Sequence, residues 1–166
     1  GCGKDTYPLI PSLYRHPDLA DTADLLTLEV KIITRFKQRS IPYLQFPPQS
    51  DWEYLFLMQH VGVPTRLLDW TENPFISLFF ALISANKDEK TSTYTTDATV
   101  WVLNPSEWNS AVLKDVGYKD GILSIEHKVV SSYKPSEDLM KNFAIAIYGS
   151  HNSPRIVAQR GVFTLF

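Results

Sequence analysis

The hydrophobic pattern predicts two helices in the first sixty residues. From Leu25 to Phe36, apolar residues recur every three or four positions, which is the spacing of one buried helix face. Asp18 or Asp21 can cap the start of this helix by accepting a hydrogen bond from a free backbone amide. A second helix is predicted from Asp51 to His60, and Ser50 can serve as its cap.

The next segment predicts a short strand and then the most apolar helix of the chain. Gly62 and Pro64 end the preceding helix, because glycine adopts the left-handed conformation that closes helices and proline cannot continue one. Thr65 to Trp70 alternates like a largely buried strand. Asn73-Pro74 then starts a helix from Phe75 to Ile83 that is apolar on almost every side, so we expect it to be enclosed on all faces at the centre of the core.

The second half of the chain predicts three more strands. Their β-branched and aromatic content places them at Ala98–Leu103, Phe143–Tyr148 and Val162–Phe166, and Asn104-Pro105 starts a short helix after the first of them. The region 111–141 is broken by glycines and gives no clear pattern. Because helices and strands alternate without regular βαβ spacing, we expect a single α+β domain with a mixed or antiparallel sheet and packed helices.

Composition and charge narrow the class of protein. The chain has 166 residues, the length of one ordinary domain. Its 16 Lys and Arg against 18 Asp and Glu give no basic excess for binding a phosphate backbone, so a nucleic-acid role is disfavoured. The longest apolar stretch, Pro74 to Ile83, is far shorter than the roughly 20 residues that a bilayer span needs. The single cysteine, Cys2, cannot form a disulfide within the chain, and we expect a cytoplasmic protein.

Both ends of the sequence resemble internal positions of a longer protein. The chain opens on Gly1 rather than on an initiator methionine, and residues 161–166 form a strand-like run without a polar tail. Natural termini are usually polar and frayed. We therefore expect residues 1–166 to be one domain of a longer chain.

Four polar residues that can bind or react lie within ten positions, at the end of the second predicted helix and in the strand after it. They are His60, Thr65, Arg66 and Asp69. Segments held by a rigid scaffold are where binding and catalytic groups concentrate. Structural roles compete with this interpretation: His60 can stabilise a helix C-terminus, and Arg66 can form a buried ion pair with Asp69 or bond the backbone. In the functional alternative, Arg66 grips an anionic substrate.

Searches for the common catalytic and metal-binding motifs fail. The four histidines lie far apart, and none has the spacing of a metal site. The chain contains no glycine-rich phosphate loop, no nucleophile elbow and no internal repeat. Nothing near Cys2 marks it as a nucleophile. Hydrolases and nucleoside triphosphatases of the common types therefore lose support.

The central stretch resembles a known family. Residues 59–71 read Gln-His-Val-Gly-Val-Pro-Thr-Arg-Leu-Leu-Asp-Trp-Thr, and Asn73-Pro74 and Phe79-Phe80-Ala81 follow. Together they resemble the signature of the FRG domain, a bacterial and phage domain named for an N-terminal Phe-Arg-Gly. The likeness extends to residues 9–15 and 155–164. The Phe and Arg of the tripeptide do not precede Gly1, and the family's usual continuation after residue 166 is absent.

The layout of this family is distantly similar to that of ADP-ribosyltransferases, in which an arginine and a polar strand grip NAD. The resemblance implies catalytic positions at His60 and Gln159. It also implies a site for NAD as a substrate, and its candidate residues are Gln59, Thr65, Arg66, Asp69 and Arg155. Gln159 stands where that plan has an acid, and glutamine can neither take a proton nor carry the stabilising charge. Transfer chemistry needs little acid–base help once the oxocarbenium-like charge is stabilised.

Three functional hypotheses follow. The first is a nucleotide-binding domain with ADP-ribosyltransferase or NAD glycohydrolase chemistry, acting in bacterial toxins or phage defence. The second is a non-catalytic module that senses a ligand or binds a protein partner. The third is another enzyme, such as a hydrolase that uses His60 and Asp69 as acid and base. The first requires His60, Thr65 and Gln159 to converge on one cleft, whereas the second permits them to be buried and mutually bonded.

Overall fold

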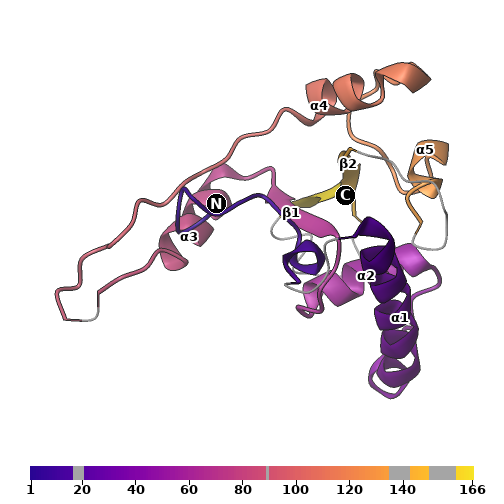
Figure 1. Cartoon of the computed structure of the whole chain (residues 1–166), viewed down its shortest axis with the longest axis horizontal. Coiled ribbons are helices and arrows are strands. Elements are labelled where there is room, and N and C mark those ends of the chain that lie inside the picture. The colour runs from indigo at the N-terminus through magenta and orange to yellow at the C-terminus, as the bar shows by residue number, and fades with distance from the viewer. Residues whose placement is uncertain (17–20, 89, 135–142, 150–159) are drawn as a thin grey trace.

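The computed structural model describes the whole chain except residues 17–20, 89, 135–142 and 150–159 (Figure 1). Three antiparallel strands and five helices make up the regular structure of this part, which confirms an α+β fold. The helices are α1 (Thr22–Ser40), α2 (Asp51–His60), α3 (Pro74–Ile83), α4 (Pro105–Val112) and α5 (Lys128–Ser131), and the strands are β1 (Leu67–Thr71), β2 (Ile145–Tyr148) and β3 (Gly161–Leu165). Short 3-10 turns lie at Ser12–Arg15, Ile41–Tyr43 and Lys114–Val116.

The sheet has the strand order β1-β3-β2, with β3 in the centre and both neighbours antiparallel to it. Leu165 lies opposite both Leu67 and Ile145, so the three residues share one face. This face packs on α2, where the Phe56 and Phe163 rings lie 5.0 Å apart between centroids. In Figure 1, α1 and α2 lie together on one side of the sheet, and α3 lies on the opposite side of the molecule.

The hydrophobic core lies between this sheet face, α1, α2 and the segment around α5. Its fully buried members, with no exposed surface, include Leu55, Phe56, Met58, Leu123, Val130, Ile145, Ile147 and Leu165. The second predicted helix and the predicted strands Phe143–Tyr148 and Val162–Phe166 thus supply the core, and all three are confirmed as elements. The core fixes the C-terminal end of α2 against β1 and β3.

Local capping signals place the helix ends. Asp21 accepts a hydrogen bond from the Ala23 amide at 3.0 Å, so it is the cap of α1, whereas Asp18 lies outside the described residues. Ser50 accepts from the Glu53 amide at 3.2 Å and begins α2 as predicted. Gly62 ends that helix region with a φ of 80°, in the left-handed region that glycine tolerates.

The prediction that α3 is enclosed on all faces is wrong. Phe75 is 79% exposed and Ile83 is 60% exposed, and among the residues of α3 only the small Ser77 and Ala81 are buried. The physical reason is the close approach of the N-terminal segment. A Cβ atom at Gly1 would lie 1.9 Å from the Ser77 carbonyl oxygen, so this contact suits the side of the helix that carries small residues. Most of the large side chains of α3 consequently face outward, namely Phe75, Leu78, Phe79, Leu82 and Ile83.

The prediction of a strand at Ala98–Leu103 is also wrong. Only Thr99 forms a bridge, in which its amide and carbonyl both bond Cys2 at 2.8 Å. Val102 is 92% exposed. The β-branched composition favours extended backbone, and the segment is extended, but a strand also needs a neighbour over its length.

The region 111–141 is irregular where it is described. Leu123 forms a parallel bridge to Ile147, which extends the sheet at the edge of β2 by one residue, and α5 is a single turn. From the sequence, Ser153 and Pro154 can also begin a short helix that Gly161 ends, but residues 150–159 lie outside the described part of the chain. Gly161, predicted to end that helix, is the first residue of β3.

Candidate functional site

A cavity of about 460 Å³ lies at the C-terminal end of α2, between β1, β3 and α3. Gln59 and His60 reach it from the last turn of α2, and Asp69 reaches it from β1. Aromatic side chains form much of the remaining wall, and they are Phe56, Trp70, Phe80, Trp101 and Phe163. The cavity is within the size range of small-molecule sites, which is roughly 300–1,000 Å³.

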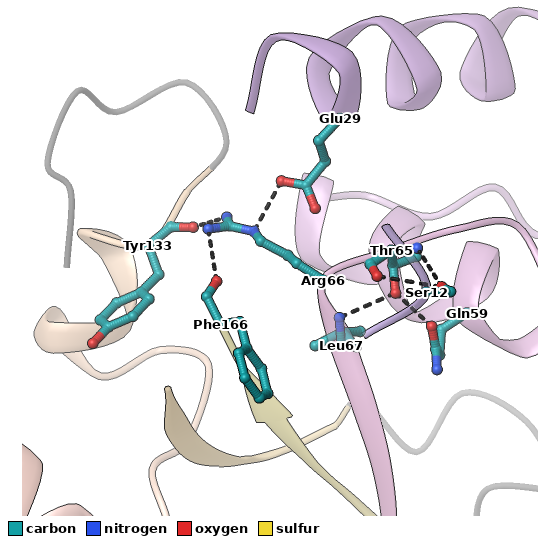
Figure 2. A network of polar contacts seen from close by, with 8 residues as sticks. All are labelled: Ser12, Glu29, Gln59, Thr65, Arg66, Leu67, Tyr133 and Phe166. Atoms are coloured by element: carbon teal, nitrogen blue, oxygen red, sulfur yellow. Dashed lines mark hydrogen bonds and ion pairs between the residues drawn. The ribbon is translucent and has the colours of Figure 1, made fainter. Parts of the chain in front are cut away.

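A chain of hydrogen bonds from Thr65 holds two of these polar residues, Gln59 and Asp69, and Figure 2 shows its part from Thr65 to Gln59. Thr65 is fully buried, and its hydroxyl bonds the Gln59 side-chain oxygen. Gln59 Nε2 in turn donates to Asp69 Oδ2 at 2.7 Å. The backbone of Thr65 is fixed as well, because its amide donates to Ser12 Oγ at 3.1 Å and its carbonyl accepts from the Leu13 amide at 3.0 Å.

The direction of each proton in this chain follows from the Asp69 carboxylate at its end. The carboxylate can only accept, so it takes the Gln59 amide nitrogen as its donor and turns the Gln59 side-chain oxygen toward Thr65. The Thr65 hydroxyl proton is therefore directed at the Gln59 oxygen, and Thr65 Oγ1 accepts from the Leu67 N–H at 3.1 Å. A carboxylate on β1 thus sets the orientation of an amide that lines the cavity.

This arrangement predicts that the Thr65 hydroxyl matters more than its methyl group. Thr65→Val keeps the shape but leaves the buried Leu67 amide and the Gln59 oxygen without their partner, so the free energy of unfolding should fall by about 1–3 kcal/mol. Thr65→Ser retains the hydroxyl and should lose markedly less. Urea denaturation of both variants measures the difference, and equal losses would show that the hydrogen-bond chain is not what makes Thr65 important.

Arg66 points away from this network and forms a second one (Figure 2). Its Nε lies 2.9 Å from Glu29 Oε2, which comes from α1. The other guanidinium nitrogens donate to the carbonyl oxygens of Tyr133 and Phe166, the latter at 3.3 Å. Arg66 is 4% exposed and Glu29 is fully buried. The arginine therefore links α1, the second residue after α5 and the residue that follows β3.

Burial controls the ionisation of the groups around Arg66. Removal from water raises the pKa of Glu29 above its ordinary 4.5, and the attraction of Arg66 opposes this shift. Burial likewise raises the pKa of Tyr133 to about 12, with Arg66 again opposing the shift. Hydrogen bonding by the backbone and side chain of Arg66 also opposes the shift, but the loss of hydration outweighs all of these contributions.

The structure brings together three of the seven sequence-predicted site residues, Gln59, His60 and Asp69. Thr65 and Arg66 do not line the cavity: the first orients Gln59, and the second joins the interior network. Gln159 and Arg155 lie outside the described residues. The expected alternative of an Arg66–Asp69 ion pair is replaced by one with Glu29.

Sequence analysis missed Glu29 and Trp101. Glu29 had a signal, since Leu25, Glu29 and Ile33 follow one another at four-residue spacing on α1 and all three are buried. Trp101 had no such signal, because it reaches the cavity from a segment that lies thirty residues after the end of β1.

The described part of the chain shows neither a metal-binding cluster nor a membrane-spanning helix. No three His, Cys, Asp or Glu side chains gather there in a way that could hold a metal ion. Among the same residues, no helix has both the length and the apolar character needed to cross a membrane.

Comparisons with known proteins identify the family through the N-terminal half. A search of curated proteins and a search of solved structures found no match. The family model for the FRG domain matches residues 1–90, which are more than half of the 166-residue chain and include all of the central motif. The C-terminal likeness at 155–164 lies beyond the matched region. The chain belongs to the FRG domain family.

Proposed function

We propose that this FRG domain binds a small molecule through a planar ring, and that the nicotinamide ring of NAD is the ring it accepts. The observation that carries the proposal is the composition of the cavity wall. Two tryptophan residues, Trp70 and Trp101, line the cavity together with the polar Gln59, His60 and Asp69. Aromatic walls with a few fixed polar groups are typical of sites for ring-containing ligands.

Charge narrows the ligand class. Among the described lining residues, the ionisable side chains are Asp69 and His60, and none is Lys or Arg. A carboxylate and indole faces favour a neutral or positively charged ring, since cations are attracted to the faces of aromatic rings. The nicotinamide ring of oxidised NAD is positively charged and carries a carboxamide. Its phosphates would lie at the mouth, because Arg66 is occupied by Glu29 and two backbone carbonyls.

Binding without turnover fits the hydrogen-bond network. Gln59 is fixed from behind by Thr65 and holds Asp69 on its other side. Such a rigid polar wall recognises a ligand at low entropic cost. The domain would then sense NAD or a related ring compound, the non-catalytic alternative that the sequence leaves open.

A catalytic function is the second candidate, and His60 favours it. His60 lines the cavity, and no hydrogen bond to another described residue engages its side chain. In this reaction the glycosidic C–N bond of NAD breaks, and nicotinamide leaves with the electron pair. A water or protein nucleophile attacks the ribosyl carbon, and His60 accepts the proton that it loses. Gln159, the other candidate of the family likeness, would be tested by substitution.

Isothermal titration with NAD tests the binding proposal, and release of free nicotinamide tests turnover. Trp101→Ala and Asp69→Asn should each weaken NAD binding at least about tenfold, whereas Asp115→Asn, on an exposed aspartate far along the chain, should not. Loss of nicotinamide release in His60→Ala, with binding retained, would support the enzyme. Absence of NAD binding by the folded protein would overturn both candidates.

A further inference from the structure

A second cavity, of about 320 Å³, lies on the opposite face of the sheet from the core. Its floor is formed by Trp70, Ala146, Val162 and Thr164. The strand register places these residues together, since Trp70 lies opposite Val162 and Ala146 lies opposite Thr164. Both pairs belong to the face that does not carry Phe163 and Leu165.

The segment that covers this face of the sheet is an extended stretch of chain and not a helix. The wall opposite the strands is built from residues 100–103, with Pro74 and Pro105 at the sides. Figure 1 shows this segment running from the region of α3 toward α4, past the sheet. An extended segment does not fill space over a sheet as a helix does, so open volume remains between the two layers.

The second cavity differs from the first in its chemistry. Glu72 is the one ionisable side chain among the described lining residues, and it is exposed. The indole N–H of Trp70 is already bonded to Thr164 Oγ1 at 3.0 Å, so it does not require a polar ligand. Valine, leucine, isoleucine and proline side chains account for much of the remaining wall. A charged group placed here would lose its hydration without a partner.

We propose that this cavity is a separate binding compartment for an uncharged, apolar ring system of a small molecule. Its size is adequate, since an apolar cavity of about 150 Å³ binds benzene. Trp70 and Trp101 contribute to both cavities, so the compartment adjoins the first one across the edge strand β1. Its occupant differs in kind from the polar or cationic ring of the first cavity.

Indole is a suitable probe, because it is neutral, apolar and contains two fused rings. A titration followed by ¹H–¹⁵N NMR of the folded chain should shift the backbone amides of Val102 and Val162, which line the second cavity alone. Shifts confined to Gln59 and His60 would place indole in the first cavity and overturn the proposal. If no amide signal shifts even at a high indole concentration, the proposal is overturned as well.

A pair of matched variants separates occupancy of the cavity from surface adsorption. Ile122→Trp fills the second cavity and should weaken indole binding at least about tenfold. Val116→Trp adds the same ring at an exposed position outside both cavities and should leave binding unchanged. Should Ile122→Trp not fold, Val162→Phe serves the same purpose. Equal affinity for indole in the filled and control variants would contradict the compartment, whatever the result with NAD.

Discussion

Replacing Glu29 with alanine is expected to lower the free energy of unfolding by about 3–5 kcal/mol, because it breaks a buried ion pair. The Arg66 guanidinium would remain buried with its carbonyl contacts but without its counterion. Its charge cannot be relieved by deprotonation, because arginine stays protonated in proteins. Urea denaturation followed by circular dichroism measures the loss.

Two further variants make the Glu29 prediction specific. Gln38→Ala, on an exposed position of the same helix, should change the unfolding free energy by less than about 0.5 kcal/mol. Glu29→Met combined with Arg66→Met should recover much of the lost stability, since two apolar side chains need no counterion. A loss of under about 1 kcal/mol in Glu29→Ala would mean that solvent reaches Arg66 and that the pair is not buried.

Asn109→Leu is expected to cost about 2–4 kcal/mol, because it leaves the buried Ala146 amide without its partner and removes one of the two donors to the carbonyl of that residue. The Ala146 amide donates to Asn109 Oδ1 at 2.8 Å, and Asn109 Nδ2 donates to the Ala146 carbonyl at 2.9 Å. Asn109 thus imitates a neighbouring strand at the edge of β2 from its place on α4, and its Nδ2 also bonds Gly121.

The control for Asn109 lies on the same helix. Glu107→Leu, at an exposed position, should alter stability by no more than about 0.5 kcal/mol. Hydrogen exchange of the Ala146 amide gives a second measurement, and its protection should fall in Asn109→Leu more than global destabilisation requires. Unchanged protection of Ala146 would contradict the role of Asn109 as a substitute strand.

Elements with strong local signals were predictable, and elements that depend on distant partners were not. Ser50 and Gly62 define the ends of α2 through hydrogen bonds and backbone geometry within a few residues. The stretch Ala98–Leu103 has strand composition, yet its pairing depends on chain far from it in sequence. The apolar character of α3 led to the prediction that the helix is buried. The side of α3 that is buried is instead the side with the small residues Ser77 and Ala81, because Gly1 lies close against it.

The site shows the same division. Gln59, His60 and Asp69 could be grouped from the sequence because a helix end and the following strand keep them close along the chain. The direction in which Arg66 points could not be predicted, since its partners Glu29, Tyr133 and Phe166 come from three distant segments. The polar network of Thr65 also depends on a distant residue, Ser12.

The most direct test of the proposed nicotinamide site is a ¹H–¹⁵N NMR titration of the domain with NAD. The proposal predicts saturable shifts of the Gln59 side-chain amide, the Asp69 backbone amide and the Trp101 indole N–H, all of which belong to residues that line the first cavity. Nicotinamide mononucleotide should shift the same three signals, because it carries the same ring. The proposal would be contradicted if NAD bound without shifting these three signals, or if NAD shifted no signal at all.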